Sequence, residues 1–221
     1  NNLPLIKYYW ENMCKIVLYS SNHKVKDLYT LPSIIESAGD KVLISRDRNE
    51  VNEALDNNPI DLIICDRQSF LLTSDQIKQV KNNCYNIHPS FLPYNRGYHP
   101  NFWSAYDNTP SGTTIHNINP NIDSGRIVAQ TLIYFDDNET LKTSYLKLRE
   151  LSVSLFKTVY PSIREGLDQT KLISNPSNIG ITNYKSDFEG ILETLPNKWE
   201  TSLGYIRNLS KTVEFKRREK H

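Results

Sequence analysis

Three polar residues of the types used in acyl-transfer chemistry stand in two short segments of the chain. Asn86 and His88 are two positions apart in a strand-like stretch, so their side chains point to the same face. Asp123 follows in a polar loop. An asparagine amide can donate to a developing oxyanion, a histidine can act as acid or base near neutral pH, and an aspartate can orient the imidazole and raise its pKa.

No serine or cysteine of the chain stands in a nucleophile-elbow pattern. The three residues therefore predict transfer of an acyl group to a nucleophile that belongs to the substrate. The spacing alone leaves an alternative open, because a single histidine on a strand is more often a structural residue than a catalytic one.

Alternating apolar runs and helical patterns must position these residues. Four short apolar runs are typical of strands buried on both faces, at 16–19, 42–44, 62–65 and 85–88. Helical patterns separate them, at 31–38, 48–55 and 75–80, the last with Ser74 as its N-cap. This order predicts an α/β fold with a Rossmann-like, mostly parallel sheet, and ligands bind such sheets at the carboxyl ends of the strands.

The second half of the chain changes character. We expect a short helix at 101–107, two strands at 113–118 and 126–133, and a long helix at 140–166 with an apolar stripe. Beyond residue 173 the pattern weakens, apart from a helix near 198–209.

The predicted organisation has a catalytic domain over 13–173 and a short C-terminal appendage over 174–221. The appendage, with Trp199, Tyr205 and Ile206 as its apolar candidates, either forms a dimer contact or packs across its own core. Met13 is the only methionine, and one hypothesis is that residues 1–12 are an extension ahead of the native start.

Composition argues against several classes of protein. The 221 residues include 26 Lys and Arg against 25 Asp and Glu, and this balance argues against nucleic acid as the main partner. The three cysteines, Cys14, Cys65 and Cys84, lack the spacing of a metal site or disulfide framework, and we expect buried thiols. No apolar run reaches the length of about 18 residues that a membrane span needs. The start of the chain has no signal-peptide pattern, so we expect a cytoplasmic protein without membrane partners.

The loop after the first predicted strand, residues 20–24, contains no glycine. Glycine-rich turns at this place hold dinucleotides and phosphates in other open α/β sheets. This argues against a nicotinamide or ATP site here.

Residues 86–93 read Asn-Ile-His-Pro-Ser-Phe-Leu-Pro, and residues 122–125 read Ile-Asp-Ser-Gly. Together they resemble the 10-formyltetrahydrofolate-dependent formyltransferases, whose pattern is Asn-x-His-x-Ser-Leu-Leu-Pro with a later Asp-x-Gly. The one departure is Phe91, and the resemblance covers about residues 15–135. It implies that Asn86, His88 and Asp123 are the catalytic trio and that 10-formyltetrahydrofolate is the formyl donor.

By this resemblance, two loops hold the folate, largely through backbone hydrogen bonds. They supply the cofactor-binding candidates Gln68, Ser69, Phe70, Leu71, Leu72, Asn121 and Ile122. Phe70 and Leu72 are either pocket walls or the apolar start of the next helix. His116 stands where the family often has a histidine, and it either supports the site or packs within its strand.

Residues 94–103 read Tyr-Asn-Arg-Gly-Tyr-His-Pro-Asn-Phe-Trp and resemble the branch that formylates amino sugars on nucleoside diphosphates. The resemblance implies substrate-binding roles for Arg96, Gly97, Tyr98, His99, Asn101 and Trp103. A guanidinium such as that of Arg96 can pair with a diphosphate. Trp103 is either a pocket residue or a core residue beside the pocket.

These resemblances imply an enzyme that formylates a nucleotide-linked amino-deoxyhexose. The first expectation is dTDP- or UDP-4-amino-4,6-dideoxyglucose, in the synthesis of lipopolysaccharide O-antigen or another surface polysaccharide, by a homodimer. Methionyl-tRNA and glycinamide ribonucleotide formyltransferases are the alternatives. The first of these carries a basic C-terminal barrel and the second a glycine-bearing loop after strand one, and neither feature is present in this sequence. A binding module without catalysis is a further alternative, and the intact trio counts against it.

Overall fold

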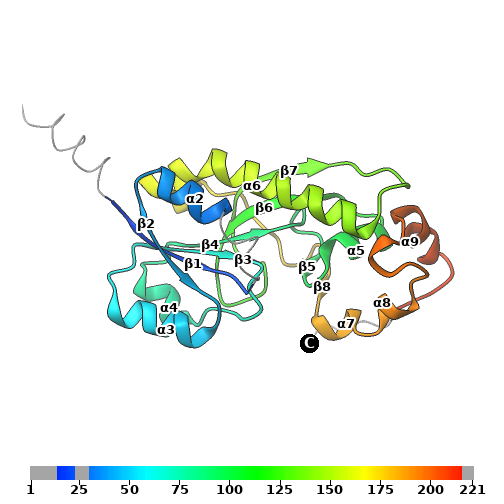
Figure 1. Cartoon of the computed structure of the whole chain (residues 1–221), viewed down its shortest axis with the longest axis horizontal. Helices are drawn as coiled ribbons and strands as arrows, with labels where there is room; N and C mark the ends of the chain where they lie inside the picture. Colours follow the sequence, from blue (N-terminus) through cyan, green and yellow to red (C-terminus); the bar gives the residue numbers. More distant parts are fainter. Residues whose placement is uncertain (1–13, 23–29, 216–221) are drawn as a thin grey trace, which may run out of the picture.

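The computed structural model describes residues 14–22 and 30–215, and their central element is a six-stranded sheet in the order β2-β1-β3-β4-β6-β7 (Figure 1). The strands are β1 (Ile16–Ser20), β2 (Lys41–Ser45), β3 (Leu62–Asp66), β4 (Cys84–His88), β6 (Ser111–Asn117) and β7 (Ile127–Ile133). The pairs among β1 to β4 are parallel, whereas β6 is antiparallel to both of its neighbours. The predicted α/β class with a mostly parallel sheet is therefore confirmed. Residues 1–12, 23 and 24, on which sequence expectations fell, lie outside the described ranges.

Helices cover both faces of this sheet. The helices are α2 (Thr30–Ser37), α3 (Arg48–Asn57), α4 (Ser74–Gln79) and α6 (Leu141–Glu165). Alternate residues of β1 point to opposite faces, so Tyr19 packs with α2 and α6 while Leu18 packs with α3 and α4. The sheet is thus sandwiched between two helical layers, as the unbroken apolar strands predict.

Several boundaries differ from the sequence expectations for local reasons. Helix α4 begins one residue early, because Thr73 and Gln76 form the capping box in place of a cap at Ser74. Helix α5 (Pro100–Tyr106) begins at a proline, which suits the first helical turn. The helix expected near 198–209 is split into η3 (Lys198–Glu200) and α9 (Leu203–Leu209), because the Ser202 side chain caps a new helix start.

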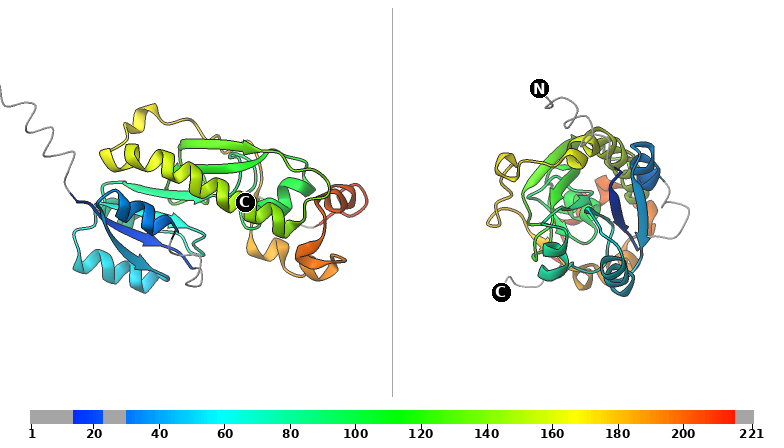
Figure 2. Two further views of the ribbon diagram at one scale, coloured as in Figure 1. Left: turned by 45° about the horizontal axis from the view of Figure 1, so that its top comes forward. Right: turned by 90° about the vertical axis from the view of Figure 1, so that its left-hand side faces the viewer.

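Residues beyond 173 pack beside α5 and the first turns of α6, at the end of the sheet away from α3 (Figure 2). The short elements here are β8 (Thr182–Asn183), α7 (Lys185–Phe188) and α8 (Ile191–Thr194), and β8 pairs with β5 (Arg96–Gly97). The element η2 (Gln169–Lys171) precedes this part of the chain, and its Gln169 bonds to Tyr85 and Asn117. Phe188, Leu203 and the fully buried Ile206 form a third core with Phe102 and Trp103 of α5. The described part of the appendage thus packs across its own core, while Tyr205 is exposed and the dimer contact stays a prediction.

Cys65 and Cys84 are buried, as expected, but Cys14 is exposed because it precedes β1 instead of lying in the sheet. Among the residues described, no set of three or more His, Cys, Asp or Glu side chains is arranged to hold a metal ion. None of the helices in the described ranges combines the length and apolar character needed to cross a membrane.

Candidate active site

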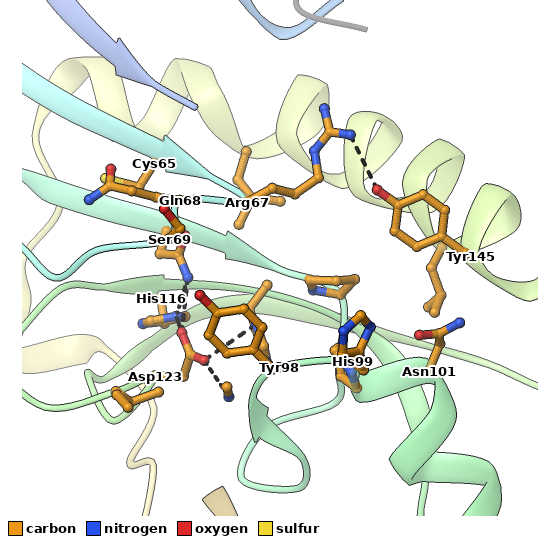
Figure 3. A pocket seen from close by; sticks show the side chains of 18 of the residues that line it. Cys65, Arg67, Gln68, Ser69, Tyr98, His99, Asn101, His116, Asp123 and Tyr145 are labelled. Atoms are coloured by element: carbon orange, nitrogen blue, oxygen red, sulfur yellow. Dashed lines mark hydrogen bonds and ion pairs between the residues drawn. The ribbon is translucent and has the colours of Figure 1, made fainter. Parts of the chain in front are cut away.

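A pocket of about 860 Å³ lies at the carboxyl ends of β3 and β4, where open α/β sheets bind ligands (Figure 3). One part of its wall comes from the loop after β3 and from the connection between β6 and β7. Another part comes from residues 97–101 and from α6. The polar residues at the end of β4 lie between these two parts.

Asn86, His88 and Asp123 meet in this pocket. The Asn86 Nδ2 donates to Asp123 Oδ1 over 3.0 Å, and His88 Nδ1 lies 3.5 Å from Asp123 Oδ2. The backbone N–H of Gly97 donates to the same Oδ2 over 2.8 Å. The carboxylate of Asp123 therefore joins both residues of β4 to the strand β5.

The loop that carries Asp123 packs closely against the end of β6, where the backbone of Gly125 approaches that of Asn117. A Cβ at Gly125 would collide with the backbone carbonyl oxygen of Asn117. Only glycine fits there, and Asp123 itself has a left-handed φ of 43°. This close approach gives a physical reason for the Asp-x-Gly pattern.

Burial and charge act against each other at this cluster. Burial alone would raise the pKa of Asp123, but the neighbouring imidazoles of His88 and His116 and the backbone N–H of Gly97 hold that pKa well below its ordinary value. Burial lowers the pKa of His88 from its ordinary 6.5, and the carboxylate of Asp123 opposes this only in part. We expected Asp123 to raise the pKa of His88; the net direction is the reverse, because burial outweighs the charge.

The hydrogen bonds of His88 define its basic atom. Its Nε2 lies 3.0 Å from the carbonyl oxygen of Asn95, which can only accept, so Nε2 carries the hydrogen of the neutral ring. Nδ1 is then unprotonated and faces the carboxylate of Asp123. A proton taken up at Nδ1 would be stabilised by that carboxylate.

His116 belongs to the same cluster, which favours the supporting role over simple strand packing. Its Nδ1 donates to the carbonyl of Asn117 over 2.8 Å, so in the neutral ring Nε2 is an acceptor. This Nε2 also lies 3.4 Å from Asp123 Oδ1, to which the protonated ring can donate. The Asn86 Nδ2 lies 3.2 Å from this Nε2, in addition to its bond to Asp123. With the His116 ring neutral, both hydrogens of the Asn86 amide are therefore held in place by neighbouring groups.

All seven residues proposed for the folate loops line the pocket: Gln68, Ser69, Phe70, Leu71, Leu72, Asn121 and Ile122. Phe70 and Leu72 also contact the core beneath α3 and α4, but neither belongs to the next helix, because α4 begins at Ser74. Gln68 Nε2 donates to the carbonyl of Phe70, while its Oε1 is buried without a hydrogen-bond partner among the described residues. This oxygen can accept an N–H from a ligand, and the mostly apolar wall suits a flat ring system, so the pocket fits a folate.

Four of the six residues proposed for the acceptor substrate line the pocket, namely Gly97, Tyr98, His99 and Asn101. His99 has a left-handed φ of 51° and packs 4.0 Å from the ring centre of Phe188. Burial lowers the pKa of His99 to about 4, so its ring is neutral near pH 7. Trp103 is fully buried in the third core, which is the second of the two alternatives weighed for it.

Arg96 does not lie in the pocket wall, contrary to expectation. Its guanidinium is buried and donates to the backbone oxygen of Asp123, and to groups of Asn175, Pro176 and Ile179 at 2.8 to 2.9 Å. These bonds join the loop of Asp123 to the segment that follows residue 173. The structure thus gives Arg96 a bracing role and not an exposed face for a diphosphate.

Sequence reasoning missed a further group of pocket residues: Arg67, Lys142, Tyr145, Leu148, Trp199 and Glu200. Tyr145 and Leu148 belong to the apolar stripe of α6, but the 3.6-residue period does not mark where that stripe leaves the core and reaches the pocket. Trp199 was weighed only as a dimer or core contact. Arg67 lies in the loop after β3 that the resemblance gave to the folate, but it was not among the cofactor-binding candidates.

Comparison with known proteins agrees with this geometry. Residues 32–160 match the family model described as "Formyl transferase". A formyltransferase from Anoxybacillus kamchatkensis, PseJ, superposes with a TM-score of 0.76 and is 30% identical, with 86% of this chain and 97% of that chain covered. Its structure is a complex with UDP-4,6-dideoxy-4-formamido-L-AltNAc and tetrahydrofolate.

Two groups of curated relatives are also similar. A dTDP-4-amino-4,6-dideoxyglucose formyltransferase of Mycobacterium tuberculosis is 35% identical over 106 residues, covering 48% of this chain and 44% of that protein. A methionyl-tRNA formyltransferase of Staphylococcus aureus is 31% identical over 152 residues, covering 68% and 48%. The matches thus span less than half the length of these curated relatives. The family match and the similarity to PseJ together show that the chain belongs to the formyl transferase family.

Proposed function

We propose that the protein transfers the formyl group of 10-formyltetrahydrofolate to the amine of a nucleotide-linked amino-deoxyhexose. The observation that carries the proposal is the meeting of Asn86, His88 and Asp123 between the proposed folate loops and the wall formed by residues 97–101. The donor supplies an activated formyl carbon, which the amine of the sugar attacks. No nucleophile from the protein is needed.

The three residues have distinct roles in this reaction. The Asn86 amide has one N–H that faces His116. Asn86 redirects this N–H toward the formyl oxygen as negative charge develops on that oxygen. His88 accepts at Nδ1 the proton that the attacking amine loses and later returns it to the departing nitrogen of the folate. Asp123 remains ionised, orients Asn86 and stabilises the protonated form of His88.

Two observations favour a nucleotide sugar over charged tRNA as the acceptor. The segment after residue 173 folds onto α5 and contributes Trp199 and Glu200 to the pocket wall, so this segment helps to enclose a small ligand. The similarity to PseJ, bound to a UDP-linked formamido sugar, extends over nearly all of that chain.

We assign dTDP- or UDP-4-amino-4,6-dideoxyglucose as the first substrate to test. Formylated sugars of this kind suit lipopolysaccharide O-antigen or related surface polysaccharides, made by a cytoplasmic homodimer. The curated relative that acts on the dTDP-linked sugar supports this choice.

The test is a thermal-shift panel of nucleotide-linked 3-amino and 4-amino deoxyhexoses, each measured with the folate present. At least one member should raise the melting temperature, and mass spectrometry should then detect its N-formyl product. Charged initiator tRNA serves as the comparison, with binding measured at several salt concentrations. Stabilisation by no sugar, or formylation of the tRNA alone with steep salt dependence, would refute the proposal.

A further inference from the structure

A second cavity, of about 440 Å³, adjoins the main pocket at Tyr98. Tyr98 lines both cavities, whereas the other residues that line the second one are exposed: Tyr184, Lys185, Ser186 and Glu189. These four belong to helix α7 and to the positions on either side of it, in the part of the chain beyond residue 173 (Figure 1). The catalytic trio and the proposed folate loops leave this cavity without a role.

Two paired strands bring Tyr98 and Tyr184 to the same end of a small sheet. In the parallel pair β5–β8, Gly97 lies opposite Asn183, so each tyrosine directly follows the last residue of its strand. The backbone N–H of Tyr98 donates to the carbonyl oxygen of Asn183 over 2.8 Å. A Cβ at Gly97 would collide with this same oxygen, and Gly97 has a φ of 83°, so this close approach requires glycine.

Strand β5 also connects the second cavity with the catalytic cluster. The backbone N–H of Gly97, the residue before Tyr98, donates to Asp123 Oδ2 over 2.8 Å. Tyr98 therefore lies between the proposed position of the reacting amine and the second cavity. A substrate whose amine lies beside His88 and Asp123 can extend past Tyr98 into that cavity.

The lysine and arginine residues that line the main pocket within the described ranges already have carboxylate partners. Arg67 pairs with Asp66 over 3.2 Å and also donates to the hydroxyl of Tyr145. Lys142 pairs with Glu200 over 2.7 Å. A diphosphate in the main pocket would therefore have to compete with a carboxylate for either cation.

Lys185 provides a cation in the second cavity. It is exposed, and within the described part of the chain no carboxylate forms an ion pair with it. The hydroxyl of Ser186, the next residue, can donate to a phosphate oxygen. Glu189 is the other charged residue that lines this cavity, and its carboxylate can accept hydrogen bonds from the hydroxyls of a ribose. The cavity thus combines two aromatic rings with groups that suit a phosphate and a sugar.

We propose that the second cavity binds the nucleoside diphosphate of the acceptor substrate, with Lys185 at the diphosphate and the rings of Tyr98 and Tyr184 against the base. This inference rests on the proposed function, because it places the part of the nucleotide sugar that does not react. Aromatic side chains stack on bases, and lysine binds phosphate as a point charge. The glutamyl part of the folate is also anionic, but it carries no ring for the two tyrosines, so the nucleotide fits the cavity better.

Calorimetric titration of the full chain tests this assignment, with UDP, dTDP and GDP as probes and folinic acid in a separate arm. Lys185→Gln removes the charge, and Lys185→Glu reverses it. Lys157→Gln is the matched control, because Lys157 is exposed on α6 and lines neither cavity. Thermal melting verifies that each variant folds.

The preferred nucleoside diphosphate should bind about threefold to tenfold more weakly to Lys185→Gln, and more weakly still to Lys185→Glu, with Lys157→Gln unchanged. The difference should shrink as salt is added, because the residues around the diphosphate are exposed and their charges are screened. Folinic acid should bind every variant within about twofold of its affinity for the unaltered protein.

Unchanged affinity of both Lys185 variants for every nucleoside diphosphate that the unaltered protein binds would overturn the inference while the proposed function stood. Weaker binding of folinic acid alone would assign the second cavity to the tail of the folate and would also overturn it. Binding of no nucleoside diphosphate by the unaltered protein would count against the proposed function itself, and the inference would fall with it.

A second pair of variants tests the place of the base. Tyr184→Leu removes the aromatic face and keeps an apolar side chain. Tyr205→Leu is its matched control, because Tyr205 is 44% exposed against 38% for Tyr184 and lines neither cavity. Tyr184→Leu should weaken binding of the same nucleotide about fivefold or more, and should raise KM for the nucleotide sugar with kcat nearly unchanged, because the base does not react. Equal nucleotide affinities of the two variants would overturn the placement of the base.

Discussion

At the scale of single residues, the proposed chemistry depends on the two neighbours of His88. The carbonyl of Asn95 fixes the hydrogen on Nε2, and the carboxylate of Asp123 lies beside Nδ1. Burial keeps the ring neutral and therefore basic near pH 7, since it lowers the pKa of His88 below 6.5. The site thus contains a neutral imidazole that can act as a base, His88, and a carboxylate that stabilises its protonated form, Asp123.

The pH profile of kcat/KM tests this arrangement. The reaction needs neutral His88, so activity should fall as the pH drops through the lowered pKa, and the acid limb should lie below 6.5. Asp123→Asn removes the charge that opposes the effect of burial, so its residual activity should show an acid limb at still lower pH. An acid limb above 6.5, or one that moves upward in Asp123→Asn, would contradict the assignment.

For Arg96, the residue type suggested a function that its contacts in the structure do not support. Arginine after a catalytic histidine suggested a diphosphate partner, but which groups satisfy a guanidinium depends on long-range packing. Here those groups come from residues 175–179, far along the chain. The sequence does not show which of the groups within reach of an arginine side chain will be its partners.

Arg96→Met should therefore lower the stability of the protein. The substitution leaves several buried oxygens without donors, and we expect the free energy of unfolding to fall by about 3 kcal/mol. Urea unfolding measures this change, with Arg46→Asn as the surface control. An unchanged free energy of unfolding combined with weaker diphosphate binding would restore the original interpretation of Arg96.

At the scale of elements, two connections hold the site: the loop after β3 and the link between β6 and β7. The strand pattern predicted the position of the loop after β3, because buried parallel strands place their carboxyl ends at one edge of the sheet. The link between the antiparallel strands β6 and β7 was expected at the site only from the family resemblance. It could not predict that the Asp123 loop approaches β6 closely enough to exclude a Cβ at Gly125. Backbone separations of that kind follow from the tertiary structure and not from the local pattern.

Gly125→Ala should displace the loop that carries Asp123. The new Cβ would collide with the backbone of Asn117, so we expect a loss of about 1–3 kcal/mol in unfolding free energy and a larger proportional loss of activity. Gly39→Ala is the control, because a Cβ there meets nothing within 4 Å and only the positive φ of 87° is unfavourable. Equal effects of the two variants on activity would show that the close approach is unimportant for the site.

At the scale of the whole molecule, the part beyond residue 173 completes the pocket. The sequence pattern weakens there because its elements are short and only one side of each is buried, so neither the period of a helix nor that of a strand is sustained. The third core joins this part to α5, and η3 then places Trp199 and Glu200 at the pocket. Prediction was strongest for the sheet and for the meeting of Asn86, His88 and Asp123, and weakest for this packed but irregular part.

The most direct test of the central claim measures formylation of a nucleotide-linked 4-amino-4,6-dideoxyhexose by the unaltered protein and by Asn86→Ala, with 10-formyltetrahydrofolate as donor. The account predicts an N-formyl product from the unaltered protein. It predicts a loss of about a hundredfold to a thousandfold in kcat for Asn86→Ala, because an oxyanion donor is removed. Full activity of Asn86→Ala would contradict the role of the trio, and absence of product with every amino sugar would contradict the proposed reaction.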